Sequence, residues 1–162
     1  MMWIVAKYNN GQSQTLKENL SKILGSEMEF YQPKIMIELR KKKFFKNILG
    51  NYVFCKHSKF SEEKILNDLK FVKGLSYFLS NYRLEQKQIL NFVHKCKNHE
   101  EKNNTLSQTF FDELVDLKAK FITGPFKSFA FEVINKNKNY FTTKINNLKI
   151  TVKKKNKYFL PL

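Results

Sequence analysis

The residue types most able to do chemistry fall into two short clusters of cysteine and histidine. Cys55 and His57 lie two positions apart, and His94, Cys96 and His99 stand close together further along the chain. A thiol beside an imidazole suits a nucleophilic cysteine, and a His-x-Cys-x-x-His spacing offers metal ligands. Neither cluster has a second pair at a zinc-like separation, and a single cysteine on an apolar helix face is usually a packing residue.

Other catalytic patterns are missing from the sequence as well. It contains no glycine-rich loop of the kind that cradles phosphate groups. Its two acidic pairs, Glu62-Glu63 and Glu100-Glu101, join neighbouring residues whose side chains point apart. We therefore expect a binding protein without metal or cofactor, and not an enzyme.

Lysine dominates the charged residues. The chain has 30 Lys+Arg against 14 Asp+Glu, a net charge of +16, and its only arginines are Arg40 and Arg83. A lysine is a point charge that suits phosphate backbones better than it suits bidentate reading of bases. Two sources of the excess stay open: contact with nucleic acid, and an AT-rich genome that favours Lys and Asn codons. The run at 40–43 has the same two interpretations, nucleic-acid contact or a solvated hairpin tip.

The length and hydropathy of the chain limit the kind of protein it can be. The chain has 162 residues, of which 42% are hydrophobic, enough for one ordinary domain or two small ones. No apolar run reaches the roughly 18 residues that a membrane-spanning helix needs. Its two cysteines suit reduced, buried thiols. We expect a cytoplasmic protein with no membrane partner.

The elements that must position these residues follow from hydrophobic periodicity. In the first part of the chain the predicted strands are residues 3–8, the part of 30–39 after Pro33, 52–55 and 74–79, and the predicted helices begin at Ser13, Ser61 and Leu84. Strand alternation places Tyr52 and Phe54 on one face and Val53 and Cys55 on the other. This order indicates an α+β domain over residues 1–98, with a mostly antiparallel sheet and flanking helices.

The composition and the hydrophobic periodicity of the chain change after that domain. Residues 99–115 are rich in polar side chains and predict a linker, closed by a short helix around Phe110 and Phe111. From 116 to 162, short alternating runs are separated by turns about every ten residues, which is typical of a small β-barrel. The fold class is thus α+β followed by a small β-barrel domain.

Four segments, in this order and spacing, resemble the NusG family of transcription elongation factors, and its specialised RfaH-like branch more than housekeeping NusG. They are Trp-Ile-Val-Ala at 3–6, Leu-Gly-Asn-Tyr-Val-Phe at 49–54, Lys-Gly-Leu-Ser-Tyr-Phe-Leu at 73–79, and Ile-Thr-Gly-Pro-Phe-Lys-Ser-Phe at 122–129, which is similar to the start of a KOW module. One departure is Gly50, where the family usually has proline. Another is the segment 144–148, which differs from the Phe-Gly-Arg form through which general NusG proteins contact Rho, so Rho binding is doubtful.

The resemblance implies a function. Members of the family bind the clamp helices of RNA polymerase, bridge the DNA channel and suppress pausing or termination. If the family's polymerase-binding positions are transferred to this sequence, Tyr52 and Phe54 form the apolar face that docks on the clamp helices, and Phe78 lies nearby. The alternative for each of these aromatic residues is a place in the domain core.

The resemblance also implies contact with the displaced non-template DNA strand, through polar residues of the first helix and the adjoining loops. The matching positions are Lys7, Asn10, Lys17, Asn19, Lys22, Lys70 and Lys73. Lysines there would hold phosphates in a salt-dependent manner, the alternative being ordinary solvated side chains.

For the KOW-like module the resemblance suggests a ribosomal small-subunit protein as partner, with Ile145 near the exposed hydrophobic contact. RfaH can fold this module as a helical hairpin, but period-two alternation here favours the barrel. We expect a monomeric antitermination factor for a subset of operons. The other interpretation is a KOW-containing RNA-binding protein associated with the ribosome.

Overall fold

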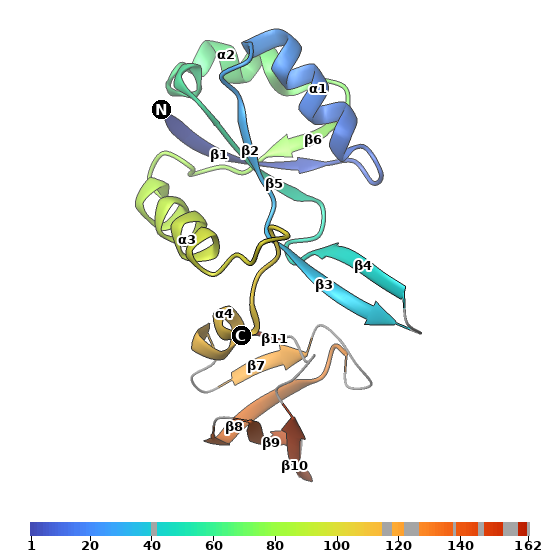
Figure 1. Ribbon diagram of the computed structural model, residues 1–162. Helices are drawn as coiled ribbons and strands as arrows, with labels where there is room; N and C mark the ends of the chain where they lie inside the picture. Colours follow the sequence, from blue (N-terminus) through green and yellow to red (C-terminus); the bar gives the residue numbers. More distant parts are fainter. Residues whose placement is uncertain are drawn as a thin grey trace. The chain divides into compact units, whose positions relative to one another are not determined.

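The computed structural model describes residues 1–39, 42–114, 118–121, 127–137, 139–145, 148–153 and 159–161. The chain divides into two compact units (Figure 1). The first contains Met1–Lys34 and Lys46–Asn98, and the second contains Ile35–Phe45 and His99–Leu162. The mixed α/β architecture has several antiparallel sheets and few helices. No helix within the described ranges is long and apolar enough to cross a membrane.

The first unit is built on a four-stranded antiparallel sheet of order β2-β5-β1-β6. Its elements are β1 (Met2–Tyr8), α1 (Ser13–Leu24), β2 (Glu29–Tyr31), β5 (Tyr52–His57), the 3-10 turn η1 (Ser58–Ser61), α2 (Glu63–Asp68), the 3-10 turn η2 (Leu69–Phe71), β6 (Leu75–Phe78) and α3 (Gln86–Asn98). The helix predicted from Ser61 begins at Glu63, because Ser61 instead closes η1 by donating its Oγ hydrogen to the carbonyl of Ser58.

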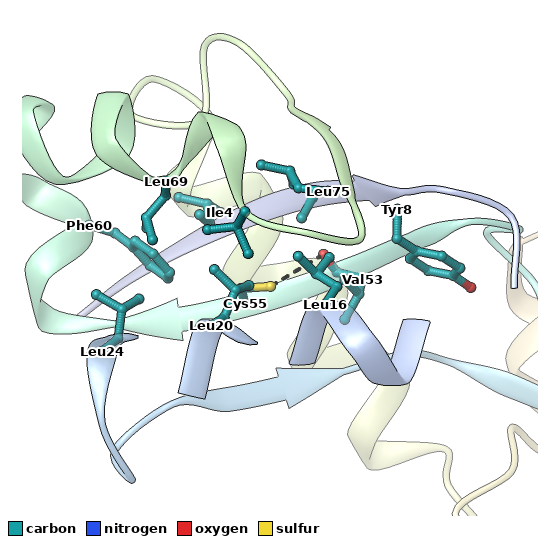
Figure 2. Packing of buried hydrophobic residues seen from close by; sticks show 12 residues of the cluster. Ile4, Tyr8, Leu16, Leu20, Leu24, Val53, Cys55, Phe60, Leu69 and Leu75 are labelled. Atoms are coloured by element: carbon teal, nitrogen blue, oxygen red, sulfur yellow. Dashed lines mark hydrogen bonds between the residues drawn. The ribbon is translucent and has the colours of Figure 1, made fainter. Parts of the chain in front are cut away.

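One face of this sheet carries the main hydrophobic core of the unit. Alternate residues of β1 and β5, among them Ile4, Val53 and Cys55, pack against Leu16 and Leu20 of α1 (Figure 2). The predicted faces of β5 are thus confirmed for Val53 and Cys55. Each fully buried aliphatic side chain of this kind contributes about 1.5–3 kcal/mol through removal of apolar surface from water.

Gly74 allows α1 to lie close to the loop before β6. A Cβ at this position would lie 2.8 Å from the backbone nitrogen of Leu16, and the residue has a φ of +96°. Both features exclude a larger residue without local rearrangement. The glycine of the 73–79 segment therefore has a packing role in this chain.

The strand predicted after Pro33 is confirmed as β3 (Lys34–Leu39). It pairs with β4 (Lys42–Asn47) in a separate two-stranded sheet, and Glu29–Tyr31 before the proline form β2. Proline has no N–H for a strand ladder, and its carbonyl here accepts a hydrogen bond from the backbone N–H of Ile48 at 3.0 Å.

The short helix predicted to close residues 99–115 is confirmed as α4 (Gln108–Leu114). The residues before it differ from the predicted polar linker, because Glu100 and Leu106 form an isolated antiparallel bridge. Leu106, Phe110 and Phe111 are buried. Their burial was not predicted, because most residues of the segment are polar. These few apolar side chains are enough to anchor the segment within the second unit.

The second unit contains a five-stranded antiparallel sheet of order β10-β9-β8-β7-β11. Its strands are β7 (Lys118–Phe121), β8 (Ala130–Lys136), β9 (Tyr140–Ile145), β10 (Leu148–Lys153) and β11 (Phe159–Pro161). The last of these was not predicted, because the segment is short and follows a lysine-rich run.

The five-stranded sheet is strongly curved. In a flat sheet, three inter-strand steps separate β11 from β9 by about 14 Å. The rings of Phe159 on β11 and Phe141 on β9 nevertheless lie 4.9 Å apart. No pairing of β10 with β11 occurs among the described residues, so they form a curled sheet and not a closed barrel. The Gly-Pro-Phe motif at 124–126 lies outside the described residues.

Candidate partner-binding face

The second face of the four-stranded sheet carries the strand with the family-like motif. On β5, Tyr52 and Phe54 point to this face, as predicted. Phe54 is 6% exposed, with its ring among those of Trp3, Tyr31 and Phe92 at centroid distances of 6.4, 6.3 and 5.7 Å. A partner would therefore meet Phe54 as the wall of a hollow and not as a projecting side chain.

Helix α3 covers part of this face and is attached near both of its ends. At the start, the Gln86 side chain accepts from the backbone N–H of Trp3 at 3.0 Å and donates to the Trp3 carbonyl at 2.6 Å. At the end, Lys97 donates to the Glu29 carboxylate at 2.7 Å, and Lys56 donates to the same carboxylate at 3.1 Å. The hydrogen bond from Lys97 is the main cause that lowers the pKa of Glu29.

An apolar pocket opens beside the first turns of α3, and we call it the α3 pocket. It holds about 420 Å³. Its apolar lining is Val5, Leu49, Phe54, Leu79, Ile89 and Phe92. The one acidic group in the lining is Glu85, whose Oε2 atom is buried and has no hydrogen-bond partner among the described residues. The pocket therefore combines apolar walls with a single carboxylate.

A cationic and aromatic row crosses the same face next to the pocket. Lys7 on β1 pairs with Tyr52 on β5 and with Tyr77 on β6. Its Nζ lies 5.8 Å from the Tyr52 ring centroid and 5.2 Å from that of Tyr77, within the range of a cation–π contact. The two phenolic hydroxyls lie 3.1 Å apart. This row is a preorganised surface that offers aromatic edges, hydroxyls and one positive charge.

Phe78, the third residue predicted for the docking face, lies on the opposite side of the sheet. It pairs with Ala6 and packs against the core under α1. Tyr77 occupies the position on the docking face that was predicted for Phe78. The signal that distinguishes them is the register of β6 against β1, since a shift of one residue reverses every side chain.

The predicted nucleic-acid residues do not form one patch. Lys7 lies on the sheet face opposite α1. On α1, Asn19 donates its side-chain hydrogen to the Lys73 carbonyl at 3.2 Å, which places the helix beside that loop. Lys17 is half-buried, and desolvation lowers its pKa. Exposed members of the predicted set are Asn10, Lys22, Lys70 and Lys73.

The cysteine and histidine clusters have structural partners. Cys55 is fully buried in the core, where desolvation raises the pKa of its thiol (Figure 2). His57 accepts a hydrogen bond at Nδ1 from the backbone N–H of Lys59 at 3.2 Å. Over the part of the chain that the structure describes, no three His, Cys, Asp or Glu side chains gather as metal ligands.

In the second unit, Ile145 is buried, which differs from the predicted place near an exposed contact. Its cross-strand neighbour Leu148 is 68% exposed. The alternation along β9 turns Ile145 inward with Phe141 and Thr143. An apolar contact at this end of the sheet would therefore be made by Leu148.

Comparison with known proteins adds little. The sequence matches no family model and no curated protein. One solved structure that it matches is described as the crystal structure of the MjSpt4:Spt5 complex in conformation B, with 12% identity, coverage of 99% of this chain and 98% of that chain, and a TM-score of 0.32. A score this low does not establish a shared fold.

Proposed function

We propose that this chain is a transcription elongation factor of the NusG type. In this proposal its first unit docks on the paired clamp helices of RNA polymerase through the face that carries Tyr52 and Phe54. The α3 pocket is the observation that supports the proposal most, because it is an apolar hollow walled by the strand that bears the family-like segment. Grooves of this kind accept apolar side chains from one face of a helix.

The chemistry of the whole face fits such a partner. The α3 pocket and the Tyr52–Lys7–Tyr77 row share β1, where Val5 lines the pocket and Lys7 centres the row. Aromatic side chains on paired strands supply contact area at a small entropic cost. Glu85 and Lys7 add charges of opposite sign that would orient a helix across the face.

The finer parts of the proposal follow the sequence resemblance. The exposed side chains of Lys22, Lys70 and Lys73 would approach the non-template DNA strand. The second unit would act as a KOW-type module that contacts a ribosomal small-subunit protein through Leu148. The factor would act in the cytoplasm as a monomer, suppressing pausing or termination on a subset of operons, with Rho binding doubtful.

Co-purification tests the docking. Leu79 lines the α3 pocket and is 37% exposed, whereas Leu90 is 50% exposed on α3 outside the pocket lining. We expect the tagged chain to retain RNA polymerase. The amount of co-purified polymerase should fall at least about tenfold for Leu79→Glu and should be unchanged for Leu90→Glu. Absence of polymerase from the original chain, or equal retention by Leu79→Glu, contradicts the docking. Ribosomal RNA in place of polymerase favours the ribosome-associated alternative.

A further inference from the structure

The carboxylate of Glu85 lies in the α3 pocket with its hydrogen bonding incomplete. Its Oε2 atom is buried, and within the described ranges no donor reaches it. The lining of the pocket includes no lysine, arginine or histidine. A hydrogen bond from a charged donor to a buried carboxylate oxygen is strong, because little water competes for the oxygen. Glu85 therefore offers an acceptor that another molecule can use.

Two cations of the same unit that could answer this acid are engaged with other groups. Arg83, two residues before Glu85, donates to the Glu63 carboxylate at 3.0 Å and to the Ser61 carbonyl at 3.1 Å. Lys7 lies over the two tyrosine rings of the row that crosses the docking face. Either side chain would have to give up these contacts to reach Glu85. A cation for Glu85 is thus more readily supplied by a second molecule.

Glu85 shares one side of α3 with two apolar residues of the pocket. The backbone N–H of Ile89 donates to the Glu85 carbonyl at 2.9 Å, so the first helical turn includes Glu85. Glu85, Ile89 and Phe92 are at positions i, i+4 and i+7 and all line the pocket. At a rise of about 1.5 Å per residue, the two apolar residues lie about 6 Å and about 10 Å further along the axis. A second helix can match these distances with side chains one and two turns apart.

The charge of the pocket selects the side chain that enters it. A wholly apolar side chain would cover the Oε2 atom without donating a hydrogen bond to it, which is unfavourable. An acidic side chain would be repelled by the carboxylate. Lysine and arginine have apolar stems that suit the pocket walls and charged ends that donate to carboxylates. A long cationic side chain therefore fits the pocket best.

We propose that the α3 pocket binds a lysine or arginine side chain from the partner's helix, and that Glu85 is the residue that selects it. This inference rests on the proposed docking on the clamp helices and adds the kind of side chain that enters the pocket. The stem packs against Ile89 and Phe92, and the charged end donates to the Oε2 atom of Glu85. A partner helix with a neutral residue at this position binds less tightly.

Co-purification of RNA polymerase with the tagged full chain tests the role of Glu85. Glu85→Gln keeps the size of the side chain and removes its charge, so it should retain at least about fivefold less polymerase. Glu18→Gln is the matched control, because Glu18 is exposed on α1, which packs on the other face of the sheet. It should retain as much polymerase as the original chain. Equal retention by Glu85→Gln would overturn the inference, and the docking itself would stand.

A second measurement needs no polymerase and identifies the cation. Three alanine-based helical peptides of about 17 residues carry leucines on one face and, one turn away, either arginine, lysine or citrulline. Citrulline has the shape of arginine without its charge. NMR titration of the isotopically labelled full chain should show at least about fivefold tighter binding of the arginine or the lysine peptide than of the citrulline peptide. This preference should disappear in Glu85→Gln, which assigns it to the pair of Glu85 and the cation.

The two measurements separate failure of the cation site from failure of the docking. A charge preference that depends on Glu85, in a chain that retains no polymerase, would contradict the docking and support the cation site. Polymerase retention together with equal affinity for all three peptides would support the docking and overturn the cation site. The peptide comparison on the original chain does not depend on the folding of any variant. Absence of binding by all three peptides would likewise overturn the cation site.

Discussion

The hydroxyls of Tyr52 and Tyr77 meet at 3.1 Å above Lys7, although their strands β5 and β6 are separated by β1. This contact closes the row across three strands and fixes the orientation of both rings. When one phenol ionises, the other can donate to it. The hydrogen bond accordingly lowers the pKa of Tyr77 and raises that of Tyr52, and the positive charge of Lys7 lowers both.

Lys7→Met should therefore move the ionisation of this tyrosine pair to higher pH. The sign follows from the loss of a cation that favours the phenolate. Tyrosinate absorbance measured between pH 8 and pH 12 reports the change, with circular dichroism to confirm that the chain stays folded. Lys149→Met, on the exposed surface of β10, is the control and should leave the titration unchanged. A titration of Lys7→Met that superimposes on the original would show that the row does not persist in solution.

Gly74→Ala should destabilise the first unit much more than Gly11→Ala. Both glycines have positive φ, which costs an L-residue about 1–2 kcal/mol. At Gly74 the added Cβ also meets the backbone of Leu16 at 2.8 Å, whereas at Gly11 it meets nothing within 4 Å. We expect a loss of about 3 kcal/mol or more for Gly74→Ala and about 1 kcal/mol for Gly11→Ala. Urea unfolding followed by fluorescence of the single, buried Trp3 measures both, and equal losses would contradict the close approach of α1.

Placing at position 50 the proline that the NusG family usually has should be harmful in this chain. Gly50 has a φ of +60°, which proline cannot adopt because its ring holds φ near −65°. Its carbonyl also accepts a hydrogen bond from the Tyr8 hydroxyl at 3.0 Å. Gly50→Pro should lower the free energy of unfolding by at least about 2 kcal/mol, and Gly50→Asn should be nearly neutral because asparagine tolerates this region. A stable Gly50→Pro protein would mean that the turn takes another conformation.

The Glu29 carboxylate should contribute stability that disappears in acid. Its pKa is lower in the folded chain than its ordinary value of 4.5, because Lys97 and Lys56 donate hydrogen bonds to it. The contribution is therefore fully present above pH 4.5 and is lost as the pH falls through the lowered pKa. Since the side chain is 39% exposed and screened by solvent, we expect less than about 1 kcal/mol.

Urea unfolding of the original chain and of Glu29→Gln at pH 7, 5, 4 and 3 measures this contribution. The difference in unfolding free energy should be constant between pH 7 and pH 5 and should shrink towards pH 3. Glu27→Gln, at an exposed neighbouring position, should give no comparable trend. A difference that grows in acid would have the wrong sign for this ion pair.

The elements with a strong local signal were predicted correctly from the sequence. The apolar spacing of Leu16, Leu20 and Leu24 and the glycine at 25 define α1, and alternation placed Val53 and Cys55 away from Tyr52 and Phe54. The buried apolar residues of 99–115 and the strand β11 were missed, because each depends on packing against residues remote in the sequence.

The sequence by itself determined which side chains of a strand share a face, since backbone geometry alone sets a period of two. Only the tertiary structure decided which strand lies beside which and in what register. That choice placed Tyr77 beside Lys7, turned Phe78 into the core, and covered Phe54 with α3. Register and helix placement depend on the summed packing of residues far apart in the chain, and no local pattern encodes that sum.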